Sequence, residues 1–411
     1  MTHRRTLTMI VLVALHSVPV HAQKVTVGAD LFLTQSFDWI KGKRIGLVVN
    51  HTSVLSDGRH LVDLLSARND LKVTALFAPE HGLRGDTTGA VPDGVDPVTH
   101  VPVFSLYGTT TKPTAEMMQS VDLLVFDIQD VGARFYTYIS TLGHCMEAAA
   151  ERGAAVIVLD RPNPVGGDHV EGPLLLDSLK SFVGFAPIPI LHGMTVGELA
   201  MMYNGEGWLK GGVRPILRVV KMERWERTMW YDQTGLRWVK PSPNMPTVST
   251  AAVYPGTCLF EGTNVSEGRG TDRPFEYIGA PWLNSAQVIE ILENAALRGV
   301  EFEPIQFTPV KRPNNVEAPK FADRGCNGLY VRVTDRETFE PVRTGIYLLW
   351  AVRSVHPDKF EWRVPAIDER SGTTEIRMLL DAGEDPEKIV ARWRKGLEEF
   401  RTRRAKYLLY R

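Results

Sequence analysis

The chain has 411 residues, of which 44% are hydrophobic and 23% charged, a composition typical of a soluble globular protein with a sizeable core. The formal net charge of −1 gives no electrostatic reason to expect binding to nucleic acid or to an anionic membrane surface. The length is greater than that of one ordinary domain and predicts two.

The first 22 residues have the pattern of a secretory signal peptide. Arg4 and Arg5 precede an apolar segment over residues 7–20, and the small residues Val20 and Ala22 stand where signal peptidase requires them. An N-terminal membrane anchor is the alternative, but the apolar segment is shorter than the ~20 residues of a membrane span. We therefore expect cleavage after Ala22, a periplasmic or secreted protein, and no membrane association after cleavage.

From residue 44 to about residue 220, short apolar runs alternate with helix-like stretches. The runs are rich in Val, Ile and Leu and mostly continuous, as expected of strands that are buried on both faces. This alternation predicts an α/β fold with a Rossmann-like, doubly wound, mostly parallel sheet. A helix is predicted over residues 135–152, and Thr195 with Glu198 forms a capping-box pattern. The predicted strands are residues 44–49, 73–78, 101–106, 121–126, 154–159, 188–191 and 216–220.

The composition changes after about residue 240. Residues 241–275 are rich in Pro, Gly, Ser, Thr and Asn, so we expect a long loop without secondary structure that closes over the site. Further α and β segments follow, and Asp385 with Pro386 predicts the start of a final helix over residues 387–401. We therefore predict a catalytic domain at residues 23–240 and a second α/β (α+β) domain at residues 241–411.

Polar side chains follow five of the predicted strands at the point where each strand ends. The clearest case is the second strand, which ends at Glu80 and His81 inside the sequence Pro-Glu-His-Gly. Because parallel strands place their carboxyl ends at one edge of a sheet, we expect these side chains to converge on one crevice. The other strand ends contribute Asn50, His51, Asp127, Gln129, Arg134, Tyr136, Asn163 and His192, and the long loop adds Asn244, Glu261, Asn264, Glu267 and Arg269.

Carboxylates, amides and arginines with aromatic neighbours are the usual lining of a carbohydrate site. Glycoside hydrolysis requires a carboxylic acid that protonates the leaving oxygen, and Glu80, at the end of an apolar strand, is the best-placed residue for that role. Asp127 and Glu267 are the candidates for a second carboxylate, as base or nucleophile. A substrate with a 2-acetamido group is an alternative source of the nucleophile.

Other chemistries have weaker support in the sequence. No Gly-x-Gly-x-x-Gly motif follows the first strand, and no Gly-x-Ser-x-Gly elbow is present, so neither a dinucleotide cofactor nor a serine nucleophile is predicted. Three cysteines with no zinc-site spacing do not predict a disulfide framework or a zinc centre. A metal-dependent hydrolase would use His51, His81, Asp127 and His192, although no metal-binding spacing links them.

The motifs at these positions resemble those of the NamZ-type exo-β-N-acetylmuramidase family of bacteria over about residues 25–411. The resemblance implies a Rossmann-like catalytic domain joined to a second α/β domain, with the active site in the cleft between them. It also implies cofactor-free hydrolysis of terminal, non-reducing N-acetylmuramic acid from peptidoglycan fragments, with Glu80 as the catalytic residue. The motifs that carry the resemblance are residues 79–82, 126–134, 160–164, 192–195, 241–247 and 261–271.

The expected partners are therefore muramyl saccharides or muropeptides derived from peptidoglycan. The lactyl carboxylate of muramic acid needs a cation, for which Arg84, Arg134 and Arg269 are available. A periplasmic muropeptide-binding protein without catalytic activity remains the alternative, because it would use the same cleft and the same export signal. The residues expected to bind substrate are Asn50, His51, His81, Arg84, Gln129, Arg134, Tyr136, Asn163, His192, Asn244, Glu261, Asn264 and Arg269.

Overall fold

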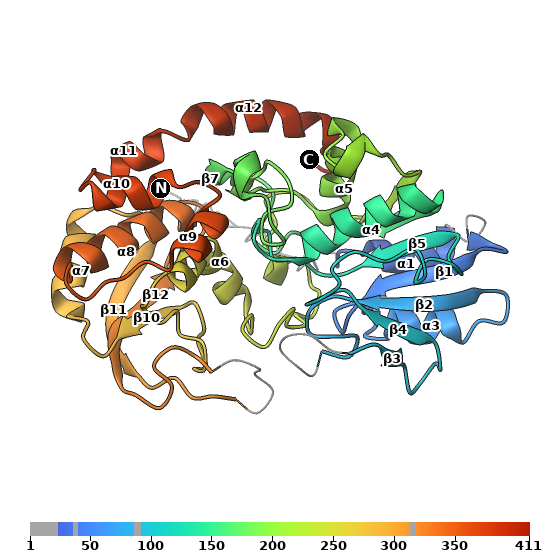
Figure 1. Ribbon diagram of the computed structural model, residues 1–411, viewed down its shortest axis with the longest axis horizontal. Helices are drawn as coiled ribbons and strands as arrows, with labels where there is room; N and C mark the ends of the chain where they lie inside the picture. The colour runs from blue at the N-terminus through green and yellow to red at the C-terminus, as the bar shows by residue number, and fades with distance from the viewer. Residues whose placement is uncertain (1–23, 36–39, 86–91, 313–317) are drawn as a thin grey trace, which may run out of the picture.

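A computed structural model describes residues 24–35, 40–85, 92–312 and 318–411, so the expected signal peptide lies outside the described residues. Two α/β units lie side by side, an N-terminal unit around a large sheet and a C-terminal unit around a smaller one (Figure 1). In these four ranges no helix has both the length and the apolarity that crossing a bilayer requires.

The N-terminal unit contains a sheet of seven described strands in the order β3-β4-β2-β1-β5-β6-β9. All neighbouring pairs are parallel except β3 with β4, so the predicted mostly parallel, doubly wound sheet is confirmed. The strands are β1 (Arg44–Val49), β2 (Lys72–Ala78), β3 (Gly94–Val95), β4 (Pro102–Ser105), β5 (Leu123–Asp127), β6 (Ala155–Leu159) and β9 (Leu217–Val220).

Two hydrophobic cores cover the two faces of this sheet, because successive strand residues point to opposite sides. Leu124 and Phe126 of β5 join the core shared with α4 and α5, whereas Leu123 and Val125 join the core shared with α1 and α3. The predicted capping box of Thr195 and Glu198 starts α5 as expected. The helices are α1 (Gly28–Gln35), α3 (Leu61–Ser66), α4 (Tyr138–Arg152) and α5 (Val196–Glu206).

One predicted strand lies outside the large sheet. The run at residues 188–191 forms β8 (Pro189–Leu191), which pairs antiparallel with β7 (Glu171–Leu174) in a separate two-stranded sheet. The prediction that His192 follows a strand of the parallel sheet is therefore wrong. A short apolar run indicates burial but does not identify the neighbouring strand, and β9 occupies the place beside β6.

The expected structureless loop at residues 241–275 contains two helices, so this prediction is also wrong. Thr247 caps α6 (Val248–Thr257) by accepting a hydrogen bond from the Thr250 amide, and η4 (Cys258–Gly262) follows directly. The apolar segment 251–253 is buried, and this tertiary burial outweighs the loop-like content of Pro, Gly, Ser and Thr.

The C-terminal unit packs its helices against an antiparallel sheet of order β10-β12-β11. Helices α6 and α8 cross where Gly256 faces Gly345, and a Cβ atom on Gly256 would lie 1.9 Å from the Pro341 carbonyl oxygen. Two glycines therefore allow the helix backbones to touch. The elements are β10 (Tyr277–Ala280), β11 (Val300–Phe307), β12 (Cys326–Val333), α7 (Ser285–Asn294), α8 (Pro341–Val355), α9 (Val364–Ser371) and α10 (Glu375–Asp381).

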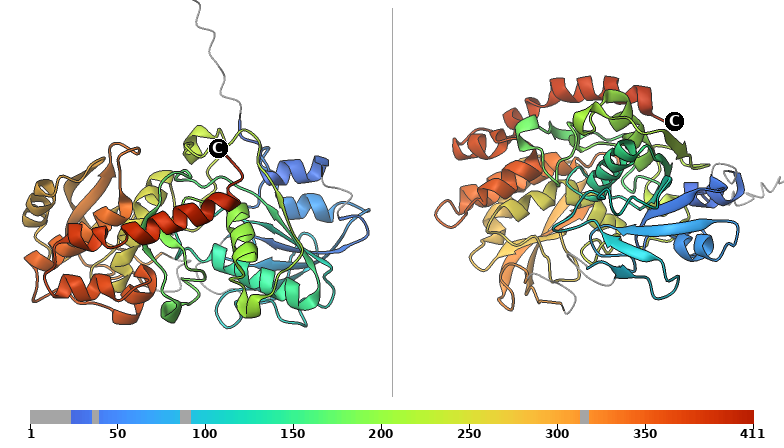
Figure 2. Two further views of the ribbon diagram at one scale, coloured as in Figure 1. Left: turned by 90° about the horizontal axis from the view of Figure 1, so that it is seen from above. Right: turned by 45° about the vertical axis from the view of Figure 1, so that its right-hand side comes forward.

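The end of the chain returns to the N-terminal unit. The predicted final helix begins at the Asp385 cap as expected but is divided into α11 (Pro386–Ala391) and α12 (Arg394–Arg404), which cross from one unit to the other (Figures 1 and 2). Arg404 donates hydrogen bonds to the carbonyls of Gly167 and Gly193, and the Tyr410 hydroxyl donates to Asp160 at 2.6 Å. The end of the chain thus joins the two units.

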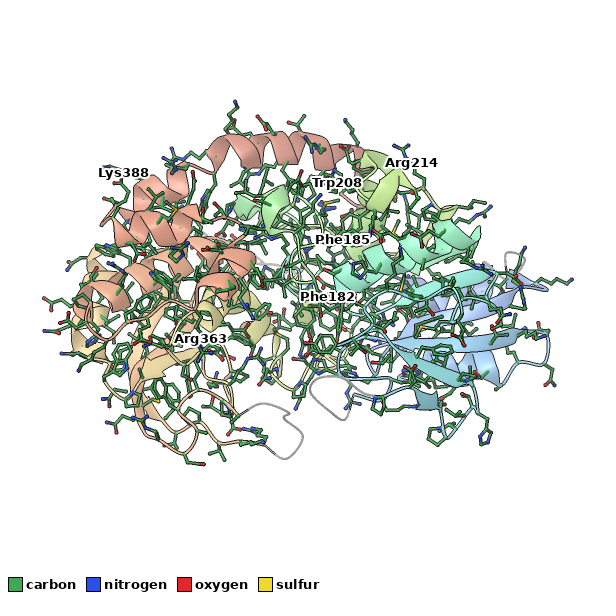
Figure 3. The ribbon with its side chains drawn as sticks, viewed as in Figure 1. Phe182, Phe185, Trp208, Arg214, Arg363 and Lys388 are labelled. Carbon is green, nitrogen blue, oxygen red and sulfur yellow. The ribbon has the colours of Figure 1, made fainter. Side chains whose placement is uncertain are left out.

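Phe182 and Phe185 lie in the middle of the molecule (Figure 3). Phe185 packs against His144 of α4 at 5.4 Å and against Tyr203 of α5 at 5.2 Å between ring centroids. The remaining short helices are η1 (Asp177–Leu179), η2 (Lys210–Gly212), η3 (Tyr231–Gln233) and η5 (Ala405–Tyr407), and the thiols of Cys145, Cys258 and Cys326 are buried and free.

Candidate active site

The chain turns sharply where β2 ends. Glu80 is partly exposed, and the next two residues, His81 and Gly82, have φ values of 75° and 70°. A positive φ is uncommon for a residue other than glycine, and such strained residues cluster at functional sites. The turn therefore places a partly exposed Glu80 at the end of β2, followed directly by a buried His81.

The end of β1 packs against this turn. His51 lies against Gly85, where a Cβ atom would come within 2.3 Å of the imidazole ring, and Gly85 has a φ of 78°. The His51 Nε2 atom also forms a 2.6 Å hydrogen bond with the Lys240 carbonyl. His51 therefore holds the turn that carries Glu80 against the segment that leads into α6.

Two buried tyrosines lie near Glu80. Burial raises the pKa of both Tyr136 and Tyr138, and the negative charge of Glu80 raises them further. The Tyr138 hydroxyl donates to the Pro241 carbonyl at 2.6 Å, and the two rings meet edge to face at 4.9 Å. Asn50 is fully buried beside Tyr138, and its Oδ1 atom accepts two hydrogen bonds from Thr52.

A chain of aromatic rings connects this region to the C-terminal unit. Tyr136 contacts Tyr254 of α6 at 5.9 Å, and Tyr254 contacts Phe275 at 4.7 Å between ring centroids. The guanidinium of Arg269 lies 5.0 Å from the centre of the Phe275 ring. The structure therefore brings the neighbourhood of Glu80 and the segment 261–269 to the two ends of one packed aromatic row.

Asp130 is a buried carboxyl close enough to Tyr136 for its charge to act on that phenol, and it is not among the site residues expected from the sequence. Its Oδ2 atom accepts a hydrogen bond from the Gly132 amide at 2.7 Å, whereas Oδ1 has no hydrogen-bond partner among the described residues. Burial raises the pKa of Asp130 to about 7, against the opposing effect of the Gly132 and Val131 amides. The sequence places Asp130 in a polar cluster but contains no signal of this burial.

Asp127 and Arg161 form a buried ion pair. Arg161 donates to the two carboxylate oxygens of Asp127, from Nε at 2.5 Å and from Nη2 at 2.8 Å. Both side chains are at least 96% buried, since Asp127 is 0% and Arg161 4% exposed. Both oxygens of Asp127 are engaged, so we assign this residue to the framework of the site rather than to the reaction.

Arg134, Asn163 and His192 also serve the framework. Arg134 is fully buried and donates to the carbonyls of Pro173, Ile188 and Arg370, which ties the two units together and removes it from contact with a substrate. The Asn163 amide donates to the Met194 carbonyl. Burial, together with the charges of Arg404 and Arg134, lowers the pKa of His192 to about 3, so the imidazole is neutral at physiological pH.

The segment 261–269 carries a network of ion pairs. Glu261 binds Arg269 and Arg370, and these two cations outweigh the effect of burial and hold the pKa of Glu261 below its ordinary value. Glu267 binds the Lys320 ammonium at 2.9 Å and lies 3.5 Å from the Arg269 Nε atom. Glu267 is therefore neutralised by two cations, which disfavours the nucleophilic role expected from the sequence.

The remaining predicted residues lie around these groups. The side chain of Asn264 bonds to the backbone of Lys359 and Glu361, which fixes the loop. Arg84 is partly exposed and binds both Asp63 and Asp96. The backbone N–H of Asn244 donates to the Ser242 hydroxyl, and the side chain of Gln129 donates to the carbonyls of Asp130 and Pro162.

The described residues contain no group of three or more His, Cys, Asp or Glu side chains arranged to hold a metal ion. Within the set considered for a metal-dependent hydrolase, Asp127 is engaged by Arg161, and His192 accepts a hydrogen bond from the Met194 amide.

Comparisons with known proteins cover nearly the whole chain. Two family models match, described as exo-beta-N-acetylmuramidase NamZ, N-terminal, over residues 45–249, and exo-beta-N-acetylmuramidase NamZ, C-terminal, over residues 252–410. The peptidoglycan beta-N-acetylmuramidase NamZ of Bacillus subtilis (strain 168) is 47% identical over 390 residues, which is 94% of this chain and 92% of that protein.

Two crystal structures of DUF1343 family proteins from Bacteroides fragilis NCTC 9343 have the same fold. One superposes with a TM-score of 0.88 at 37% identity and covers 94% of this chain and 99% of its own. The other superposes with a TM-score of 0.78 at 35% identity and covers 95% and 99%. The matched regions therefore include both units.

Proposed function

This chain belongs to the NamZ family of exo-beta-N-acetylmuramidases, and we propose that it hydrolyses the bond that links terminal non-reducing β-N-acetylmuramic acid to peptidoglycan fragments, with Glu80 as the general acid. The chain is accordingly a glycosidase. The observation that carries the assignment of Glu80 is its position on a strained turn at the edge of the sheet, beside two buried tyrosines.

In the proposed reaction the Glu80 carboxyl donates its proton to the glycosidic oxygen as the bond to the anomeric carbon breaks. Positive charge develops on the sugar ring in the transition state, and water then completes hydrolysis. An acid in this role works best when its pKa is raised towards the working pH. The Glu80 carboxyl follows the apolar end of β2, near the rings of Tyr136 and Tyr138.

Asp130 replaces Asp127 and Glu267 as our proposal for the second carboxyl of the reaction. Asp130 lies near enough to Tyr136 for its charge, like that of Glu80, to raise the pKa of that residue. Among the described residues, the basic side chain within ion-pair distance of Asp130 is His192 at 4.0 Å, and this imidazole is neutral at physiological pH. Its role is either to activate water or to orient the acetamido group of the substrate.

Asp130→Asn is expected to change both activity and the pH dependence of stability. A loss in kcat of about 10²-fold is expected if the carboxyl takes part in proton transfer. Because its folded pKa is raised from 3.8 to about 7, the charged form is disfavoured in the folded state, and the wild-type free energy of unfolding falls as the pH rises from about 4 to about 7. Since one unit of pKa shift corresponds to about 1.4 kcal/mol, the free energy of unfolding of the wild type is expected to fall by up to about 4 kcal/mol over this pH range because of Asp130. The variant is expected not to show this contribution.

Kinetic assays and urea unfolding at pH 4.5, 5.5, 6.5 and 7.5 provide the two measurements. Asp160 and Glu171 also have raised pKa values and contribute to the slope in both proteins, so the difference between wild type and variant is the relevant quantity. If the free energy of unfolding depends on pH equally in wild type and variant, the raised pKa of Asp130 is contradicted. If kcat is unchanged in the variant, Asp130 takes no part in the reaction.

The proposed activity predicts a specific substrate preference. The enzyme is expected to release N-acetylmuramic acid from a disaccharide with that sugar at the non-reducing end, and to hydrolyse the matching N-acetylglucosaminide with roughly 10- to 100-fold lower kcat/KM. The preference reflects one charge-assisted contact of about 1.5–3 kcal/mol to the lactyl carboxylate. Arg269 and Arg84, which are 36% and 31% exposed, are the accessible arginines among those expected from the sequence.

Product analysis by liquid chromatography and mass spectrometry measures this preference. The assay is run with and without a chelator, since the metal-dependent alternative requires loss of activity on chelation. Tight binding of the disaccharide without release of a monosaccharide would instead support the non-catalytic binding protein.

We also propose that the enzyme is exported to the periplasm or the medium, where peptidoglycan fragments occur. The support is the signal-peptide pattern of residues 1–22, which predicts a mature chain beginning at Gln23. The mass of the protein recovered from cell fractions checks this, and a cytoplasmic product that retains Met1–Ala22 would contradict it.

A further inference from the structure

Three arginines are available for the lactyl carboxylate of the substrate, and the structure distinguishes them by their surroundings. Arg134 is fully buried and donates to backbone carbonyls, so it does not reach a substrate. Arg84 and Arg269 are partly exposed, and both bind carboxylates of the protein. A substrate carboxylate is attracted by a cluster with net positive charge and repelled by one with net negative charge. The balance of charge around each arginine therefore decides between them.

Arg84 lies in a cluster with an excess of negative charge. Its Nη2 atom donates to Asp63 at 3.0 Å and to the two oxygens of Asp96 at 3.1 and 3.0 Å. Its Nη1 and Nε atoms donate to the same two carboxylates. Two carboxylates thus share one guanidinium, and all three of its nitrogens are engaged. This cluster is unsuited to a further carboxylate.

Arg269 lies in a cluster with an excess of positive charge. Glu261 accepts hydrogen bonds from Arg269 through Oε1 and from Arg370 through Oε2, so two cations share this carboxylate. Glu267 accepts from the Lys320 ammonium at 2.9 Å and lies 3.5 Å from the Arg269 Nε atom. Among the described residues, the ion pairs of this cluster join three cations and two carboxylates, which leaves one positive charge without a counter-charge.

The excess charge is presented by Arg269. Its Nε and Nη2 atoms donate to Glu261, whereas Nη1 is not buried and forms no hydrogen bond with a described residue. Arg269 is 36% exposed, against 21% for Arg370 and 10% for Lys320, whose ammonium also donates to two backbone carbonyls. Burial lowers the pKa of Lys320 and the charge of Arg363 lowers it further, so a fourth cation lies near the cluster.

A row of packed aromatic rings connects Arg269 to the region of Glu80. The guanidinium lies 5.0 Å from the centre of the Phe275 ring, and the centroids of Phe275, Tyr254 and Tyr136 follow at 4.7 and 5.9 Å. Burial raises the pKa of both tyrosines; the charge of Arg269 opposes this rise at Tyr254, and that of Glu80 adds to it at Tyr136. The cation and the proposed acid thus act on neighbouring rings.

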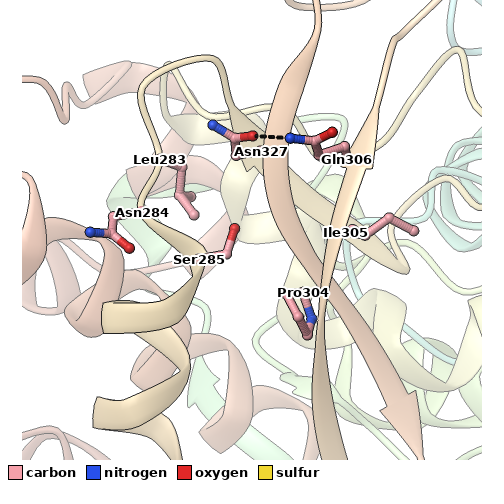
Figure 4. A pocket seen from close by; sticks show the side chains of 7 residues that line it. All are labelled: Leu283, Asn284, Ser285, Pro304, Ile305, Gln306 and Asn327. Atoms are coloured by element: carbon pink, nitrogen blue, oxygen red, sulfur yellow. Dashed lines mark hydrogen bonds between the residues drawn. The ribbon is translucent and has the colours of Figure 1, made fainter.

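A hollow of about 470 Å³ on the C-terminal unit is not an alternative site for the carboxylate. Its lining residues are uncharged, and two of its amides bond to each other, since Gln306 Nε2 donates to Asn327 Oδ1 at 3.0 Å (Figure 4). A carboxylate in this hollow would meet no cation in the lining. Charge, rather than volume, therefore selects the cluster around Arg269.

We propose that Arg269 binds the lactyl carboxylate of the substrate and determines the preference for N-acetylmuramic acid. A guanidinium with a free N–H group suits a charge-assisted hydrogen bond to a carboxylate. Arg370 is a positioning residue: it shares Glu261 with Arg269, and without it the cluster would have as many carboxylates as cations. The inference rests on the proposed function, because it names the residue that recognises the distinctive group of that substrate.

Two substrates that differ only in this carboxylate test the proposal, 4-nitrophenyl β-N-acetylmuramide and its methyl ester. Wild type is expected to prefer the acid roughly 10- to 100-fold in kcat/KM, the effect of one charge-assisted hydrogen bond. Arg269→Met is expected to remove this preference. Glu261 keeps Arg370 and Glu267 keeps Lys320 in this variant, so neither carboxylate loses its last cation. The ratio compares two substrates on one preparation and does not depend on the fraction of folded protein.

Further variants separate the positioning residue and the rival arginine. Arg370→Met is expected to reduce the preference, and Arg370→Lys, which keeps the charge, to restore most of it. Arg332→Met is the matched control, because Arg332 is 43% exposed on the same unit and also binds two carboxylates; it should keep the preference of wild type. An unchanged preference in Arg269→Met, or its loss in Arg84→Gln, would overturn the assignment. An unchanged preference in Arg370→Met would remove the positioning role.

Failure of the proposed function gives a different result, since wild type would then release no sugar from either substrate. Calorimetric titration with N-acetylmuramic acid and its methyl ester tests Arg269 in that case, because these probes have no glycosidic bond to hydrolyse. The acid is expected to bind wild type roughly 10- to 100-fold more tightly than the ester, and Arg269→Met is expected to bind both equally. Equal affinities of wild type for acid and ester would overturn the proposal.

Discussion

Glu80→Gln is expected to lower kcat for release of N-acetylmuramic acid from a disaccharide by roughly 10²- to 10⁴-fold, which is the range of general acid catalysis. Glutamine has nearly the same shape as glutamic acid but cannot donate a proton to the leaving oxygen. The turn at the end of β2 is set by His81, Gly82 and the contact of Gly85 with His51, none of which the substitution changes. KM is therefore expected to remain within a few-fold of wild type.

The leaving group determines whether Glu80 acts as an acid. A 4-nitrophenyl glycoside releases a stable anion and needs little protonation, so the variant should lose much less activity on this substrate than on the disaccharide. An equal loss on both substrates would assign Glu80 another role. Glu116→Gln, at an exposed glutamate of the same unit, is the matched control and should retain wild-type rates on both.

Much of the N-terminal unit was predictable because its strands are buried on both faces. Such strands appear in a sequence as continuous apolar runs, and the predicted and observed bounds of β1 agree at both ends. The apolar run at residues 188–191 shows what such a pattern does not determine. It forms β8 as a strand, but its pairing with β7 outside the large sheet depends on tertiary contacts that the run itself does not encode. Helix α6 was missed because Pro255 and Gly256 resemble loop residues, although Gly256 is required by the crossing with α8.

The site was predictable as a set of residues but not as a set of roles. The strand-end argument located Glu80, and it located Asp127 equally well, because both lie at the carboxyl ends of strands of the large sheet. Their difference depends on Arg161, which is distant in sequence and pairs with only one of them. Glu267 is likewise neutralised by Lys320, 53 residues away, whereas the burial of Asp130 has no sequence signal at all.

Asp127→Ala is expected to lower the free energy of unfolding by about 3–5 kcal/mol, because it leaves the buried guanidinium of Arg161 without its counter-charge. The pair lies beneath the ends of β5 and β6, where Arg161 also holds the Val54 carbonyl, so its loss affects the framework on which the catalytic region rests. Chemical unfolding of wild type and variant, followed by circular dichroism, measures the difference.

The alternative, that Asp127 is the second catalytic carboxylate, predicts the opposite pattern for a paired replacement. The double variant Asp127→Leu/Arg161→Met removes both charges of the pair. If the pair serves only the framework, this variant is expected to recover most of the stability lost in Asp127→Ala, because apolar replacement of a buried ion pair is often close to neutral. Its kcat is then expected to stay within about tenfold of wild type. If Asp127 reacts, the same double variant folds but is inactive, with kcat lowered by 10² or more. A stable, inactive double variant would therefore restore Asp127 to the reaction, and a stable, active one leaves the chemistry to Glu80 and Asp130.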